Sequence, residues 1–335
     1  MSDKYQEKDQ SKFLKNLSRT RTNKAIRHLF SDVVLEKKDL IYPLFVYEDL
    51  LQPEDLSALF GQKKQTQSSI LKEIESCLEM GISSFLLFIV PSKKSEQHFD
   101  YQFDEKIFKS IKNAFGDNII LFADVCLCSQ TSHGHCGLLD ESRKKIDNHQ
   151  SVLELTKKAL LYAESGVDVI SPSDMMDNRI SSIRESLDKH HFDDTLIMSY
   201  STKFASNFYG PFRNVAQSTP SFGDRKSYQI DYRHQKDAIN ASLRDKQQKA
   251  DILMVKPALS YLDIIYRLKT NKELENTPIA AYQVSGEYQG LKVMADAGLI
   301  DFHEGLLETL YSIKRAKADF IITYAAKELS AKGML

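Results

Sequence analysis

The chain has 335 residues, of which 42% are hydrophobic and 27% charged, and its formal net charge is -1. This composition is typical of a globular protein large enough for one α/β barrel or two average domains, and it argues against a disordered chain or a nucleic-acid surface. No apolar stretch reaches the roughly 18 residues of a membrane span, and the first residues lack the apolar core of a signal peptide. We therefore expect a cytoplasmic protein with no nucleic-acid or membrane partner.

Residues 1–30 differ from the rest of the chain. They carry eight Lys or Arg against three acids and have no core pattern. We interpret them as an amino-terminal arm, with Phe13, Leu14 and Leu17 available to pack on a partner, although a disordered tail has the same composition. The predicted domains are the arm, 1–30, and one catalytic domain, 31–335.

Short apolar runs alternate with amphipathic stretches from residue 39 onward. The predicted strands cover 39–48, 83–90, 118–126, 166–173, 196–203, 250–257, 278–285 and 319–325. The predicted helices cover 71–80, 103–114, 151–165, 180–189, 235–247, 261–270, 290–297 and 302–316. Eight strand-helix units predict an α/β fold of the (β/α)8 TIM-barrel type, which carries its chemistry at the carboxyl ends of the strands.

Three of the four cysteines follow the third predicted strand, at Cys126, Cys128 and Cys136. The first two cysteines are two residues apart, so on a strand their side chains point the same way. Nearby glycines allow the chain to turn back and bring the third cysteine close to them. Three thiolates suit zinc with an open, catalytic fourth position. Alternatively, His133 or His135 closes a structural site, or the cysteines are ordinary reduced thiols.

Two lysines end neighbouring strands, Lys203 after Met-Ser-Tyr-Ser-Thr and Lys256 after Ile-Leu-Met-Val. Desolvation and a second ammonium both lower the pKa of a lysine, which frees its amine to attack a ketone and form a Schiff base. A solvated lysine at a strand end is the alternative for each.

The segment 204–231 is long for a barrel loop and contains Arg213, Arg225 and Gln229. Such a segment is typically a lid, and two arginines can clamp a carboxylate; the alternative is a polar surface excursion. Further along, Ser285 and Tyr324 stand near the last two strand ends, where their hydroxyls can bind a second carboxylate or simply belong to the core.

Several of these motifs together resemble the porphobilinogen synthase (5-aminolaevulinic acid dehydratase) family, zinc-dependent type. They are Asp124-Val-Cys-Leu-Cys128, Thr131-Ser-His-Gly-His-Cys-Gly137, Pro172-Ser-Asp-Met-Met-Asp177, Ser199-Tyr-Ser-Thr-Lys-Phe-Ala-Ser206, Phe208-Tyr-Gly-Pro-Phe-Arg213, Met254-Val-Lys-Pro257 and Tyr282-Gln-Val-Ser-Gly-Glu287. The resemblance runs from about residue 17 to 328. It implies a homo-octamer that condenses two 5-aminolaevulinic acid molecules into porphobilinogen, with loss of two waters, in haem and tetrapyrrole biosynthesis.

The resemblance also implies roles for individual residues. Lys256 forms the principal Schiff base, Lys203 forms a second one or lowers its neighbour's pKa, and Cys126, Cys128 and Cys136 hold the zinc. One substrate carboxylate is bound by Ser285 and Tyr324 and the other by Arg213, Arg225 and Gln229. The remaining residues of the implied site are Asp124, Ser173, Tyr209 and Tyr282.

One position departs from the family pattern. Ala241 stands where many bacterial relatives have a glutamate of an allosteric magnesium site, and alanine offers no ligand to a hard cation. Magnesium activation is therefore not expected. Two rival functions remain at this stage: a lysine-dependent aldolase with structural zinc, and a zinc-holding interaction or redox-sensor module.

Overall fold

The computed structural model describes residues 14–335, apart from the side chains of 14–17 and of Asn214, and it divides after Val34 into two compact units. The described part of the first unit contains the 3-10 helix η1 (Leu14–Arg21) and the helix α2 (Lys24–Leu29), in which no residue is buried. Phe13 and the side chains of Leu14 and Leu17 lie outside the described residues. The division into an arm, 1–30, and a catalytic domain, 31–335, stays a prediction.

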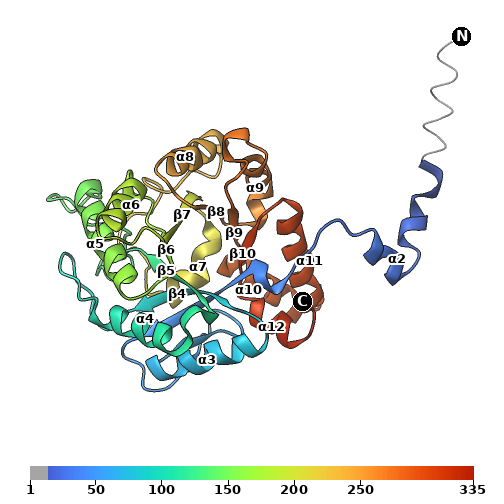
Figure 1. Ribbon diagram of the computed structural model, residues 1–335, viewed down its shortest axis with the longest axis horizontal. Helices are drawn as coiled ribbons and strands as arrows, with labels where there is room; N and C mark the ends of the chain where they lie inside the picture. The colour runs from blue at the N-terminus through green and yellow to red at the C-terminus, as the bar shows by residue number, and fades with distance from the viewer. Residues whose placement is uncertain (1–13) are drawn as a thin grey trace, which may run out of the picture. The chain divides into compact units, whose positions relative to one another are not determined.

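The second unit, Leu35–Leu335, is a closed barrel of eight parallel strands (Figure 1). Each strand pairs with the next along the chain, and the last pairs with the first. Every predicted strand contains an observed one, so the (β/α)8 prediction is confirmed. The strands are β1 (Leu40–Tyr47), β4 (Ser84–Val90), β5 (Ile120–Val125), β6 (Val169–Pro172), β7 (Leu196–Lys203), β8 (Ile252–Lys256), β9 (Ile279–Tyr282) and β10 (Phe320–Ile322).

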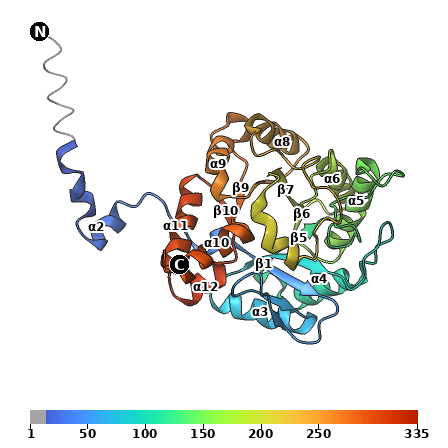
Figure 2. The same cartoon turned by 180° about the vertical axis from the view of Figure 1, so that it is seen from behind.

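Helices surround the strands in both views of the barrel (Figure 2). They bury one face each, as α4 does with Ile107, Phe108 and Ile111, because apolar residues three and four apart share a helix face. β1, β4 and β8 are buried along their whole length, because core side chains cover one face and helices the other. The helices of this layer are α3 (Gln67–Glu79), α4 (Gln102–Phe115), α5 (Asn148–Glu164), α6 (Arg179–Lys189), α8 (Gln235–Gln247), α9 (Leu262–Lys269), α10 (Ser285–Asp296) and α11 (Phe302–Arg315).

The eight predicted helices are all present, but α10 begins five residues before the predicted start at Gly290. Ser285 was predicted to end a strand but is the first residue of α10. The helix begins there because the Glu287 carboxylate accepts a hydrogen bond from the Val284 N–H at 2.8 Å. Several short elements were not predicted, and they are α7 (Gly210–Val215), α12 (Ala326–Ala331), β2 (Glu54–Asp55), β3 (Lys63–Gln65), η2 (Lys37–Asp39), η3 (Gly116–Asn118), η4 (Asn207–Tyr209), η5 (Leu259–Tyr261) and η6 (Lys272–Leu274).

Membrane insertion by a helix has no support in the described part of the chain, where no helix is both long enough and apolar enough to span a bilayer.

Candidate active site

The two strand-end lysines lie side by side inside the barrel mouth. Lys203 and Lys256 are register partners across β7 and β8, and both are buried. The Lys203 ammonium donates a hydrogen bond to the carbonyl of Ser173, at the end of β6. Adjacent parallel strands thus bring together the two amines, as the sequence led us to expect.

Lys256 is surrounded by aromatic rings. Burial first, and then the nearby Lys203 ammonium, lower its pKa to about 7, so a large fraction of its amine is free near neutral pH. The rings oppose this effect in part, because their faces attract a cation. Their centroids lie 4.0 Å (Tyr282), 5.0 Å (Phe212), 5.1 Å (Tyr200) and 5.6 Å (Tyr209) from its Nζ.

Two of these rings were not identified from the sequence. Tyr200 stands three residues before Lys203, and an odd spacing on a regular strand places two side chains on opposite faces. A register shift between Ser199 and Thr202 interrupts the alternation, and the Tyr200 ring lies 5.6 Å from Lys203 Nζ. Phe212 comes from α7, a helix that the sequence did not predict.

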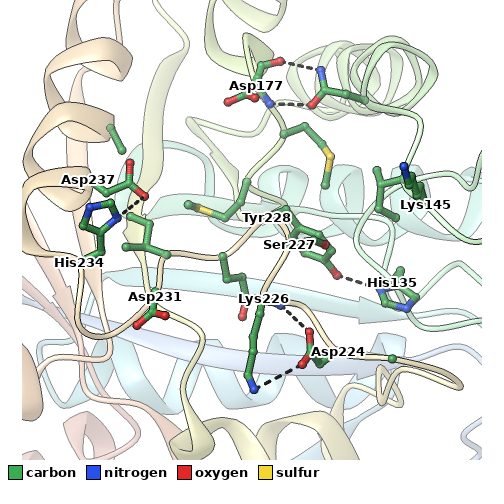
Figure 3. A pocket seen from close by; sticks show the side chains of 18 of the residues that line it. His135, Lys145, Asp177, Asp224, Lys226, Ser227, Tyr228, Asp231, His234 and Asp237 are labelled. Carbon is green, nitrogen blue, oxygen red and sulfur yellow. Dashed lines mark hydrogen bonds and ion pairs between the residues drawn. The ribbon is translucent and has the colours of Figure 1, made fainter.

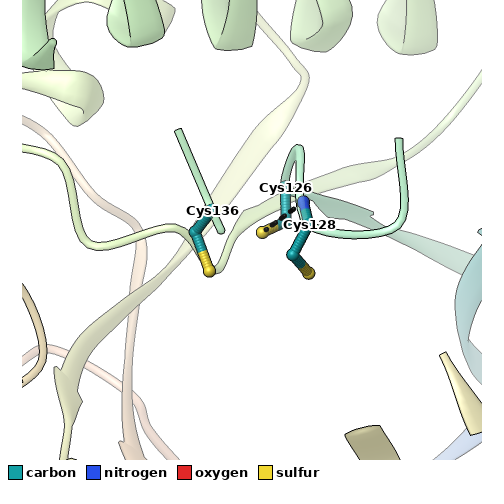
Figure 4. Close-up of side chains that lie close together, drawn as sticks. All are labelled: Cys126, Cys128 and Cys136. Carbon is teal, nitrogen blue, oxygen red and sulfur yellow. Dashed lines mark hydrogen bonds between the residues drawn. The ribbon is translucent and has the colours of Figure 1, made fainter. Parts of the chain in front are cut away.

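The three cysteines converge beyond the end of β5 (Figure 4). Their sulfur atoms all lie within 4.8 Å of one another, all three side chains are buried, and none forms a disulfide. Gly134 makes the return turn with φ +73°, a conformation that glycine adopts without strain. Within the part of the chain that the structure describes, this is the one group of His, Cys, Asp or Glu side chains arranged to hold a metal.

The donor set fits a soft metal with an open position. Sulfurs that share a tetrahedral zinc are about 3.8 Å apart, which is compatible with three sulfurs that all lie within 4.8 Å of one another. Hydrogen bonds from Cys126 and Cys128 lower the pKa of Cys136, which favours a thiolate. Neither neighbouring histidine belongs to the cluster: His135 Nδ1 contacts the Tyr228 hydroxyl at 3.1 Å, and His133 Nδ1 accepts the His135 N–H.

The lid segment, residues 204–231, packs on the cysteine loop, residues 126–137. Ser221 N–H donates to the His133 carbonyl at 3.0 Å, and an Arg225 N–H donates to the Gly134 carbonyl at 2.8 Å. A Cβ at Gly134 would lie 2.4 Å from the Thr219 carbonyl oxygen, so the two backbones touch there. The lid and the candidate metal site therefore form one packed structure.

Three lid residues retain hydrogen-bonding capacity. Both polar atoms of the buried Gln229 side chain lack a partner, as do the Nε atoms of Arg213 and Arg225. Burial lowers the pKa of Arg213. Each is thus free to bind a ligand group, although their predicted role as carboxylate binders stays a prediction.

Asp124 joins the lysine pair to the cysteine cluster. Burial, and then the nearby Cys128, raise its pKa to about 6, while Lys203 and Lys256 lower it. One of its oxygens is buried without a hydrogen-bond partner. This carboxyl can therefore exchange a proton near neutral pH.

Several hydroxyl groups lie at or just after the ends of β9 and β10, and one of them belongs to Tyr282, whose ring contacts Lys256. The Tyr282 and Tyr324 hydroxyls are 3.1 Å apart, and the Ser285 Oγ accepts the Phe212 N–H at 2.9 Å. Glu287, which sequence reasoning left without a role, accepts the Leu259 N–H at 2.8 Å and so links the chain after β8 to the start of α10. Burial raises the pKa of Glu287 to about 7.

A separate cavity of 790 Å³ lies between the lid segment, the 139–148 loop and α8 (Figure 3). Of the predicted site residues, only Gln229 lines it. Ala241 is also in its wall, beside the ion pair of Arg244 with Asp177 at 2.7 Å. That Ala241 prevents activation by magnesium stays a prediction.

A closed parallel barrel with buried lysines, a carboxyl and a thiol cluster at its strand ends defines a TIM-barrel enzyme. A family model for "Delta-aminolevulinic acid dehydratase" matches residues 14–332. Relatives with the same description from Helicobacter pylori and Methanothermus sociabilis are 45% and 43% identical, covering 94% and 93% of this chain and 98% and 97% of theirs. The chain belongs to the delta-aminolevulinic acid dehydratase family and is a lyase.

A solved structure gives the same result. The delta-aminolevulinic acid dehydratase (porphobilinogen synthase) from Toxoplasma gondii, in complex with the reaction product porphobilinogen, is 38% identical. It superposes with a TM-score of 0.89, covering 95% of this chain and 91% of that one. The resemblance seen in the sequence motifs is confirmed.

Proposed function

We propose that this protein condenses two molecules of 5-aminolaevulinic acid to porphobilinogen with loss of two waters. The observation that carries the proposal is the pairing of Lys203 with Lys256 across β7 and β8, beside three converging cysteines. Family membership supports the same reaction. An aldolase or a zinc-holding module has no comparable support.

In this proposal Lys256 attacks the ketone of one substrate, and the resulting imine provides an electron sink for carbon-carbon bond formation. Its pKa of about 7 supports the assignment, since only the free amine is nucleophilic. Lys203 either forms a second imine or acts as the cation that lowers its neighbour's pKa. Asp124, which has an oxygen without a hydrogen-bond partner, accepts protons from the two lysines and returns protons to them.

The two substrate carboxylates are assigned to different clusters. Ser285 and Tyr324 bind one, and Arg213, Arg225 and Gln229 bind the other. The free capacity of Gln229 and of both arginines supports this division. Ser173, Tyr209 and Tyr282 line the site, and the Tyr209 hydroxyl donates to the Lys256 carbonyl at 3.0 Å, which orients that strand end.

We further propose that Cys126, Cys128 and Cys136 hold zinc. The thiol donor set and the absence of either histidine from the cluster support an open, catalytic site. Zinc bound there would supply a Lewis acid beside the second substrate. A homo-octamer in the cytoplasm completes the proposal, on the strength of the family resemblance.

The direct test incubates the purified, zinc-supplied protein with 5-aminolaevulinic acid and assays for a pyrrole with an aldehyde colour reagent. The proposal predicts a pyrrole product that requires Lys256. A hydroxy-carbonyl adduct formed from added aldehydes, with no pyrrole, would instead identify an aldolase. No turnover of either substrate, with zinc bound, would reject both enzymes.

A further inference from the structure

A buried lysine lies behind the cysteine loop and takes no part in the proposed chemistry. Lys158, in the middle of α5, has a side chain only 3% exposed. Its ammonium donates a hydrogen bond of 3.0 Å to the carbonyl of Cys126, the first residue of the cysteine cluster. A helix in the outer layer is thus connected directly to the backbone of a candidate metal ligand.

The surroundings of Lys158 are built to keep its charge inside the protein. Its Nζ lies 3.9 Å from the fully buried carboxyl of Asp104, which also accepts a hydrogen bond from the Tyr162 hydroxyl. The ring centroids of Tyr101 and Tyr162 are 5.2 and 5.4 Å from the ammonium. A buried ammonium is costly unless it is paired, and here the Asp104 carboxyl and the two rings offset that cost.

The carbonyl of Cys126 is the group that needs a partner. The ladder between β5 and β6 ends with Ser173 N–H donating to the Val125 carbonyl at 3.0 Å, so Cys126 lies just beyond it. The next carbonyl, of Leu127, begins a turn that accepts two backbone N–H groups. Lys158 thereby fixes the peptide that joins the strand to the turn bearing Cys128.

We propose that Lys158 is a positioning residue for the metal site, an inference that rests on the proposed binding of zinc by the three cysteines. Its hydrogen bond sets the direction of the Cys126 side chain. Such partners outside the ligand set typically change metal affinity by about 10- to 100-fold.

The test measures zinc affinity of the full chain by competition with a chromogenic chelator. Lys158→Met is expected to bind zinc about 10- to 100-fold more weakly. The matched control is Lys157→Met, one residue along α5, where the side chain is 65% exposed; it should bind zinc as the wild type does. Excess zinc should restore turnover of Lys158→Met, which general damage to the barrel would not permit.

Lys158→Met leaves the Asp104 carboxyl buried without its cation and so endangers folding. The double variant Asp104→Asn, Lys158→Met removes both charges and should show the same loss of affinity in a folded barrel. Wild-type affinity in that double variant would overturn the inference while leaving the metal site intact. Unchanged zinc affinity in Cys126→Ser would overturn the metal site itself, and this inference with it.

Discussion

Lys203 and Lys256 are close enough for the charge of one to control the chemistry of the other. Only the unprotonated amine of a lysine is nucleophilic, so we expect the kcat/KM of the wild type to rise with pH through about 7, where Lys256 loses its proton. Lys203→Met removes the neighbouring cation, while Asp124, Cys126 and Cys128 still favour the charged form. The acidic limb of the kcat/KM profile should then move to higher pH, by on the order of one unit.

That profile, measured on both proteins with 5-aminolaevulinic acid as the substrate, separates the two roles considered for Lys203. A shifted limb with residual turnover at high pH identifies Lys203 as the cation that lowers the pKa of Lys256. Complete loss of turnover at every pH identifies a second imine. A limb that stays at the same pH, with turnover retained, would contradict the electrostatic coupling.

At the scale of elements, the contact between the lid segment and the cysteine loop offers a matched pair of substitutions. Gly134 and Gly223 both have positive φ, of +73° and +58°, but only at Gly134 does an added Cβ meet backbone, at 2.4 Å. Replacing either glycine by alanine costs about 1 kcal/mol of backbone strain. Gly134→Ala should also displace the lid and lower kcat/KM about 100-fold, as misplaced binding groups do.

The kcat/KM of both variants is compared with that of the wild type by steady-state kinetics. Circular dichroism confirms that each variant is folded. Gly223→Ala should stay within a few-fold of the wild type. Equal losses in the two variants would mean that backbone strain, and not the contact with the Thr219 carbonyl, accounts for the effect.

The three thiols of the cysteine loop allow a prediction of how the activity responds to metal removal. Chelation should abolish turnover, and added zinc should restore it, because three thiolates leave the metal a position for substrate. Thiophilic lead should inhibit by competing for sulfur. If the metal-free enzyme keeps full turnover and merely melts at a lower temperature, the site is structural.

Elements built from local pattern were predictable, and so were the contacts that strand pairing enforces. Side-chain contacts that depend on loops and outer helices were not. β8 is readable as an apolar run that ends in lysine, and β7 as a strand that also ends in lysine. Parallel pairing of the two strands then places Lys203 beside Lys256. The cation-ring contact of Phe212 depends on α7, a six-residue helix inside the lid. The hydrogen bond from Lys158 to Cys126 spans 32 residues, from the middle of α5 to the turn after β5, and in a sequence Lys158 is one more helical lysine.

At the scale of the whole molecule, the arm is the segment to test. It is basic and lacks a core pattern, and we predict that it packs on a neighbouring subunit. Deleting residues 1–24 should give assemblies smaller than an octamer, with reduced activity, as measured by light scattering and turnover. A truncated protein that remains octameric and fully active would return the arm to the disordered-tail interpretation.

The same two measurements, repeated with added magnesium, test the consequence of Ala241. Its methyl group offers no oxygen to a hard cation, and the nearby Asp177 is already paired with Arg244. Magnesium should therefore neither stimulate the intact enzyme much nor rescue the truncated one. Strong activation would mean that another residue supplies the missing carboxylate.

In the proposed reaction Lys256 forms the imine with substrate. The most direct measurement is borohydride reduction of the enzyme in the presence of 5-aminolaevulinic acid, followed by mass mapping of the peptides. We predict a stable substrate adduct on Lys256, and turnover at least about a thousandfold lower in Lys256→Met. An adduct found only on other residues, or near-normal turnover in Lys256→Met, would contradict the account.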